Sequence, residues 1–152
     1  PTPPPGRGRR QRQMCIRDSG NTDFSPIKGP PGESCCHNYV LMRNDGTQIS
    51  VPYDFDNTGF ANPPHARPNP RFGLANVKQR MYRGRCVNND QLETTFQLFR
   101  DNKEEIYGLV NNLQGLSNRE RKKTIRYMDA FYKIINSERQ VNYRFVKACL
   151  GG

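Results

Sequence analysis

The sequence contains no tryptophan, and apolar residues make up only 34% of its 152 residues. It also lacks any run of about 18 apolar residues, the length that a transmembrane helix needs. The first residues are rich in proline and arginine rather than apolar, so no secretory signal is visible there. Glycine (13 residues) and proline (12 residues) are frequent. This composition predicts one modest core and a chain that is partly loop-rich or disordered.

The excess of positive charge is unevenly spread along the chain. The formal net charge is +10, and residues 1–19 supply +4 of it through five arginines and one aspartate, which leaves +6 for the remainder. This segment shows no apolar periodicity, and its last six residues, Met14 to Ser19 (MCIRDS), resemble a translated sequencing adapter from assembled environmental reads. We therefore predict that residues 1–19 are a disordered, artefactual tail. The alternative is a basic arm that binds nucleic acid.

A β-hairpin is predicted after a loop-like stretch at residues 20–38. Residues 39–43 include a short apolar run, residues 47–53 alternate between polar and apolar, and the Asn44-Asp45-Gly46 sequence between them is a strong turn signal. Proline and glycine dominate residues 57–73, which predicts a long loop. Residues 76–83 are expected to form a short helix that Gly84 interrupts.

From residue 90 onward, the apolar residues follow the spacing of helices. One helix is expected to end near Gly115, and the next begins at Ser117, which forms a capping box with Glu120. A last helix is expected over residues 138–149. The predicted fold class is therefore α+β, with the hairpin packed on a C-terminal helical subdomain of about three helices. The stripe of the first helix consists of Leu92, Phe96, Phe99, Ile106, Val110 and Leu113.

Polar residues that suit a metal ion fall at one end of the predicted hairpin. Asn38 directly precedes the first strand, Asp54 ends the second, Asp56 follows two residues later, and Asp23 lies upstream in a Gly-Asn-Thr-Asp sequence. Because a hairpin folds back on itself, Asn38 and Asp54 are predicted to lie at the same end. Carboxylate and amide oxygens are ligands that suit Mg²⁺. His37, beside Asn38, is interpreted as a structural residue.

The order of these residues resembles the catalytic and metal-binding loops of CotH-like and related atypical kinases. It is also similar to a poorly characterised bacterial family that has a Gly-Asn-Thr-Asp-aromatic-Ser, His-Asn and Pro-Tyr-Asp-Phe-Asp series. The similarity includes the Tyr82-Arg83-Gly84 segment and Cys86, and it covers residues 20 to about 149.

The resemblance implies a kinase C-lobe-like fold and Mg²⁺-dependent phosphoryl transfer from ATP or another nucleotide. Asp23 would then be the catalytic carboxylate. Asn38 and Asp54 would be the metal ligands, and Asp56 would be an auxiliary ligand or a support for Asp54.

Two features depart from the kinase pattern. Fourteen residues separate Asp23 from Asn38, whereas kinase catalytic loops have about four at this place. The residues ahead of Asp23 include no Gly-rich phosphate loop, strand lysine or paired glutamate. We therefore expect residues 20–152 to be a single partial domain that is inactive alone, because the half that grips the nucleotide is missing. Its parts are a hairpin region (20–56), a Pro-rich region (57–86) and a helical subdomain (90–149).

Besides Cys15, the sequence contains Cys35, Cys36, Cys86 and Cys149, without the Cys-x-x-Cys spacing of a zinc site. One or two disulfides are compatible with this number, for example from Cys35 or Cys36 to Cys86, and they would suit an exported protein. Four reduced thiols in a cytosolic domain are the alternative. The location stays open, and the family resemblance together with the cysteines favours an extracytoplasmic one.

Three functions compete, and whether the chain is an enzyme stays open. The first is a fragment of a phosphotransferase, with a nucleotide and an unknown acceptor as partners. The second is a non-catalytic domain of the same fold that binds the cell envelope or another surface. The third is a nucleic-acid-binding module. The sequence has no aromatic-basic strand motif, so no nucleic-acid partner is expected, and the basic residues of 119–123 are interpreted as a solvated face.

Overall fold

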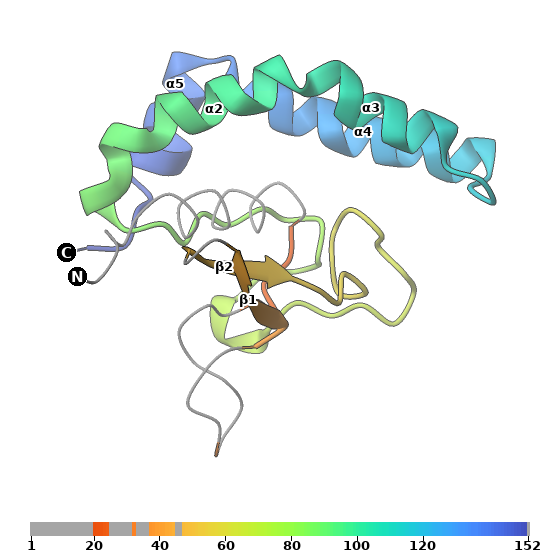
Figure 1. The fold of residues 1–152 in the computed structure, drawn as a ribbon, viewed down its shortest axis with the longest axis horizontal. Coiled ribbons are helices and arrows are strands. Elements are labelled where there is room, and N and C mark those ends of the chain that lie inside the picture. Colours follow the sequence, from red (N-terminus) through yellow and green to blue (C-terminus); the bar gives the residue numbers. More distant parts are fainter. Residues whose placement is uncertain (1–19, 25–31, 33–36, 45–46, 152) are drawn as a thin grey trace. The chain divides into compact units, whose positions relative to one another are not determined.

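The structure is a computed structural model that describes residues 20–24, 32, 37–44 and 47–151 (Figure 1). It confirms a mixed α+β chain with a small antiparallel sheet and several helices. The predicted tail at residues 1–19 lies outside the described residues. The chain divides into two compact units, Pro1–Met81 and Tyr82–Gly152. Each unit is described by itself below, and a single domain over residues 20–152 stays a prediction.

The first unit contains the hairpin that the sequence predicts. Strand β1 (Tyr39–Asn44) pairs antiparallel with β2 (Thr47–Pro52), with Tyr39 opposite Pro52 and Asn44 opposite Thr47. The Tyr53 N–H donates to the Asn38 carbonyl at 3.0 Å, which extends the pairing one step beyond the strands. This register confirms that Asn38 and Asp54 lie at the same end of the hairpin.

An aromatic contact joins residues 20–24 to the hairpin. Phe24 is fully buried, and its ring centroid lies 5.4 Å from that of Tyr39 and 5.3 Å from that of Phe55. Aromatic pairs at such distances stabilise a fold by more than the burial of their surface area alone. This contact holds the segment that carries Asp23 against the end of the hairpin.

After the hairpin, residues 53–81 of the first unit are irregular apart from a 3₁₀ helix, η1 (Pro70–Phe72). The prediction of a helix at residues 76–83 is wrong, because the chain forms a turn there. Asn76 Oδ1 accepts the Lys78 N–H at 3.0 Å, and Gln79 Oε1 accepts the Ala75 N–H at 2.7 Å. These side chains bind the backbone N–H groups themselves, which favours a turn over a helix.

The second unit is helical (Figure 1). The 3₁₀ helix η2 (Cys86–Gln91) leads into α2 (Leu92–Asp101) and α3 (Lys103–Asn112), and α4 (Asn118–Ile135) runs back beside α3. The short α5 (Glu138–Val141) and the π-helical turn η3 (Asn142–Val146) follow. Phe96, Phe131 and Phe145 are fully buried, and Phe145 packs edge-on against Phe96 with ring centroids 5.0 Å apart. No described helix has both the length and the apolar character needed to cross a membrane.

The single helix predicted from residue 90 to Gly115 is interrupted at Asn102. The Asn102 backbone has φ −98° and ψ 11°, and its side-chain amide donates to the Leu98 carbonyl at 2.8 Å. Asparagine competes with the helix through such local bonds. Leu113, which the sequence places on the buried stripe, is 56% exposed.

The predicted start of the next helix is confirmed. Ser117 Oγ accepts the Glu120 N–H at 3.2 Å, and the Ser117 hydroxyl also donates to the Glu120 carboxylate. These are the two residues of the capping box, although here the glutamate binds the serine side chain. The bond from Ser117, with a second from Lys123, lowers the pKa of Glu120 to about 2. The last predicted helix, 138–149, is helical only to Val146.

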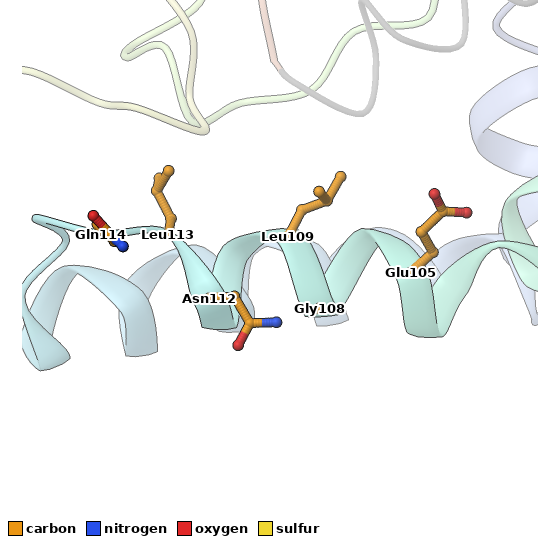
Figure 2. Close-up of a pocket in the computed structure, with 6 residues that line it drawn as sticks. All are labelled: Glu105, Gly108, Leu109, Asn112, Leu113 and Gln114. Carbon is orange, nitrogen blue, oxygen red and sulfur yellow. The ribbon is translucent and has the colours of Figure 1, made fainter.

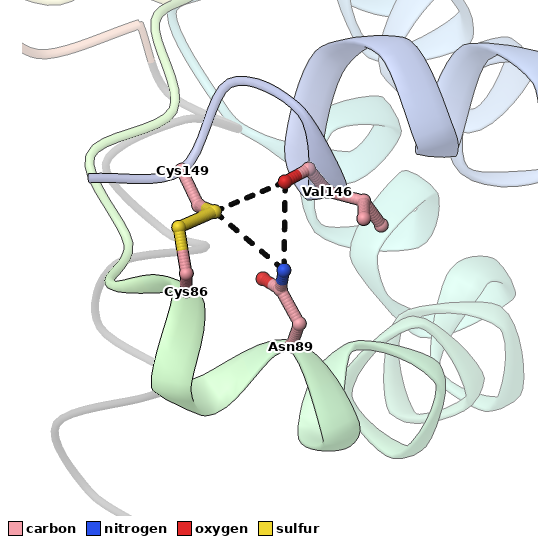
Figure 3. The surroundings of a disulfide bond; sticks show 4 residues. All are labelled: Cys86, Asn89, Val146 and Cys149. Carbon is pink, nitrogen blue, oxygen red and sulfur yellow. Dashed lines mark hydrogen bonds between the residues drawn. A yellow bond between two sulfur atoms is a disulfide. The ribbon is translucent and has the colours of Figure 1, made fainter. Parts of the chain in front are cut away.

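A disulfide closes the second unit (Figure 3). Cys86 and Cys149 are bonded across 63 residues of sequence, with Cα atoms 5.0 Å apart. Beside the bond, the Cys86 N–H donates to the Leu150 carbonyl at 2.9 Å, and the Leu150 N–H donates to the Gly84 carbonyl at 2.8 Å. The suggested pairing of Cys86 with Cys35 or Cys36 is therefore wrong, because the returning helices bring Cys149 to Cys86. Cys35 and Cys36 themselves lie outside the described residues.

We expect the variant Cys86→Ala/Cys149→Ala to unfold at lower urea concentration than the unreduced protein. A disulfide that closes a loop of this length restricts the unfolded chain and stabilises the fold by about 4 kcal/mol. Urea unfolding followed by circular dichroism measures the difference.

The matched control is Cys35→Ala/Cys36→Ala, which also removes two cysteines and should keep the disulfide. Trypsin without reductant should release residues 86–100 linked to residues 148–152. Recovery of these two peptides only as separate species would contradict the pairing.

Candidate functional site at the end of the hairpin

The segment that carries Asp23 is anchored by Asn21, which is fully buried. Asn21 Oδ1 accepts the Asp23 N–H at 2.7 Å, and its side-chain amide donates to the Asp54 carbonyl at 3.4 Å. One asparagine thus joins the backbone at both predicted acidic positions. The sequence reasoning missed Asn21. The available signal was its place two residues before Asp23, where asparagine often closes a local turn.

Asn38 binds Asp23 directly. Its side-chain amide donates to the Asp23 carbonyl at 3.2 Å and to Asp23 Oδ2 at 3.3 Å. Only 9% of Asn38 is exposed. A buried amide without partners would be costly, so these bonds hold the two segments together.

His37 contacts the other oxygen of the same carboxylate. His37 Nε2 lies 3.2 Å from Asp23 Oδ1, and both side chains are about one-third exposed, at 38% for His37 and 35% for Asp23. Both carboxylate oxygens of Asp23 are therefore engaged, one by an amide and one by an imidazole. The sequence reasoning treated His37 as structural, and its place directly before Asn38 was the signal that it would share the carboxylate.

The backbone at Asn38 and at Asp54 is left-handed, with φ of 57° and 60°. This conformation costs an ordinary L-residue about 1–2 kcal/mol, although asparagine and aspartate tolerate it better than most. Such backbone outliers cluster at functional sites, where the surrounding structure holds them. The two outliers flank the paired end of the hairpin, where the Asn38 carbonyl accepts the Tyr53 N–H.

Asp54 and Asp56 are both exposed to solvent. Asp54 Oδ1 accepts the Asp56 N–H at 3.3 Å, and Asp56 Oδ2 lies 3.7 Å from His65 Nε2. Within the described part of the chain, neither carboxylate pairs with a lysine or an arginine. Both therefore keep free oxygen lone pairs on the surface.

The structure brings Asp23 and Asn38 into direct contact and ties both to the backbone of Asp54 through Asn21 and the hairpin register. Asp56 is linked to these residues through its backbone N–H, which donates to Asp54. Among the described residues, no three histidine, cysteine or acidic side chains are grouped as metal ligands. A Mg²⁺ site needs fewer protein ligands than three, because this ion is often bound by one or two carboxylates together with substrate phosphates and water. The donor set of two carboxylates and one amide fits that chemistry, and the ligand roles stay predictions.

A surface depression in the second unit has a different character (Figure 2). It runs along the end of α3, and Leu109 and Leu113, which are 69% and 56% exposed, lie on it with Glu105 and Asn112. One carboxylate and two amides, those of Asn112 and Gln114, beside exposed leucines form no site for phosphoryl chemistry. The depression therefore contributes nothing to the predicted site.

Comparisons with protein-family models, with curated proteins and with solved structures found no match to this chain. The resemblance to CotH-like kinases therefore stays a prediction that depends on the residues named above.

We expect Asn38→Ala to destabilise the first unit by about 2–3 kcal/mol. The change removes a buried hydrogen-bond donor from Asp23 and places alanine in a left-handed backbone. Urea unfolding, followed by NMR signals of residues 37–44 and 51–58, measures the loss.

The matched control is Asn62→Ala. Asn62 is exposed and also has positive φ (43°), so alanine there adds backbone strain without breaking the bond to Asp23. Equal losses in the two variants would show that the Asn38 side chain does not hold the site together.

Proposed function

We propose that the first unit carries the catalytic and metal-binding loops of a Mg²⁺-dependent kinase-like phosphotransferase. Asn38 and Asp54 hold the metal ion, Asp56 assists them, and Asp23 orients the acceptor hydroxyl. The observation that carries the proposal is the hydrogen bond from the buried Asn38 amide to the Asp23 carboxylate, at the end of the hairpin where Asp54 also lies. Residues far apart in sequence are thus held at one place.

Phosphoryl transfer depends mainly on positioning and on charge stabilisation. A bound Mg²⁺ would neutralise the negative charge of the phosphates. The protein's own contribution is a carboxylate whose orientation is fixed, because Asp23 is held on both oxygens by His37 and Asn38. Asp23 is also 35% exposed, so an acceptor hydroxyl can reach it.

The metal ligands differ in how firmly they are held. Asn38 is buried and its amide nitrogen is occupied by Asp23, so its amide oxygen is the atom that would contact the metal. Asp54 is exposed and one of its oxygens accepts the Asp56 N–H. The metal would therefore bind between a fixed amide and an accessible carboxylate, with substrate phosphates and water as further ligands.

The nucleotide would need additional groups. The sequence has no Gly-rich loop, strand lysine or paired glutamate ahead of Asp23, and these are the groups with which kinases hold the phosphates. We therefore expect the 152-residue chain to bind Mg²⁺ or Mn²⁺ without transferring phosphate. A kinase C-lobe-like arrangement of hairpin and helices is part of the same proposal.

The test uses Mn²⁺, a paramagnetic substitute for Mg²⁺, and the 152-residue chain. We expect Mn²⁺ to broaden the NMR signals of residues 23, 38, 54 and 56 first, and excess Mg²⁺ to restore them. Asp54→Asn should weaken Mn²⁺ binding about tenfold or more, which is the size of loss typical for residues that hold a metal or its ligands.

The control is Asp90→Asn, at an exposed aspartate in the second unit. It makes the same chemical change away from the hairpin and should leave Mn²⁺ binding unaltered. Equal Mn²⁺ affinity in Asp54→Asn and the unaltered chain would refute the ligand role. A non-catalytic surface-binding domain would then become the better interpretation.

A further inference from the structure

Four cations of α4 have no partner in the part of the chain that the structure describes. The other two cations of α4 have a structural contact: Arg121 donates to four carbonyl groups at the end of α3 and in the turn that follows it, and Lys123 pairs with Glu120. By contrast, Arg119, Lys122, Arg126 and Lys133 are exposed, and their side chains make no hydrogen bond or ion pair with any residue that the structure describes. We call these four residues the basic stripe.

The basic stripe occupies one narrow face of the helix. At 100° per residue, its members fall within an arc of about 60°, and the stripe is about 21 Å long at a rise of 1.5 Å per residue. Asp129, at the edge of the arc, is the nearest acidic residue on α4, and its carboxylate accepts the Tyr107 hydroxyl at 2.7 Å. The stripe is therefore a line of positive charge that no acid of α4 interrupts.

We propose that the basic stripe of α4 docks the protein on the surface of an anionic lipid bilayer. A straight helix touches a flat surface along one line, so a flat partner engages only charges within a narrow arc. A nucleic acid, whose phosphates surround a groove, would use cations over a wider arc. The partner that best complements a straight and narrow row of cations is therefore a flat anionic surface.

The other faces of α4 indicate that the helix would adsorb on the bilayer surface rather than insert into the bilayer. Its apolar residues Met128, Phe131 and Ile135 are buried in the core of the second unit. Helices that insert into the interface instead present an apolar face beside the cations. Binding by the stripe alone is therefore electrostatic and should be sensitive to salt.

The test is co-sedimentation of the 152-residue chain with vesicles. We expect binding to vesicles of phosphatidylcholine with about one-third phosphatidylserine at low salt, loss of binding at about 0.5 M salt, and none to pure phosphatidylcholine. A cation near an anionic surface strengthens binding about fivefold. The variant R119Q/K122Q/R126Q/K133Q should therefore bind about 10² to 10³ times more weakly.

The control variant K78Q/R85Q/R139Q/K147Q removes the same charge from four exposed cations elsewhere. It keeps the arginines of residues 1–19, as the stripe variant does, so those arginines cannot explain a difference between the two. Glutamine and lysine have similar helix propensities, and circular dichroism should show unchanged helicity in the stripe variant.

Equal vesicle binding by the two variants would overturn the proposal, and so would failure of the unaltered chain to bind anionic vesicles. Binding to a DNA duplex that only the stripe variant loses, without vesicle binding, would also overturn it and would assign the stripe to nucleic acid. None of these outcomes depends on metal binding by the first unit.

Discussion

The hydrogen bond between the Asn38 amide and the Asp23 carboxylate is the interaction on which the candidate site depends. Fourteen residues of sequence lie between Asp23 and Asn38, and the same amide also binds the Asp23 carbonyl. The Asn38 carbonyl meanwhile accepts the Tyr53 N–H at the end of the hairpin. One residue therefore links the segment of Asp23 to both strands, and the position of Asp54 follows from that link.

The polar residues at the end of the hairpin are held at a cost in folding stability. Asn38 and Asp54 both have left-handed backbones, and Asn21 and Asn38 are buried polar residues. A fold that needed only stability would more often bury apolar side chains at these places. The rings of Phe24, Tyr39 and Phe55 pack beside this group and help to hold it. A polar group held in strained geometry next to exposed carboxylates is typical of a functional site.

Local signals in the sequence predicted the elements well where they act over a few residues. The Asn44-Asp45-Gly46 turn signal defined the hairpin, and the Ser117 capping box defined the start of α4. The interruption at Asn102 and the turn at residues 75–79 were missed because asparagine and glutamine side chains bind the backbone there, which apolar periodicity does not reveal. The Cys86–Cys149 bond was missed because the path of four helices decides which cysteines meet. In the site, the predicted hairpin placed Asn38 and Asp54 at one end, as the register shows. The bond from Asn21 to the Asp54 carbonyl and the contact of His37 with Asp23 were missed, because they join segments that are distant in the sequence.

The most direct test of the assembled site is a crystal structure of the chain with Mn²⁺, in which anomalous scattering locates the ion. The account predicts a peak about 2 Å from both the Asn38 amide oxygen and an Asp54 carboxylate oxygen, with Asp23 hydrogen-bonded to Asn38 beside it. A peak elsewhere, or an Asn38 side chain turned away from Asp23, would contradict it.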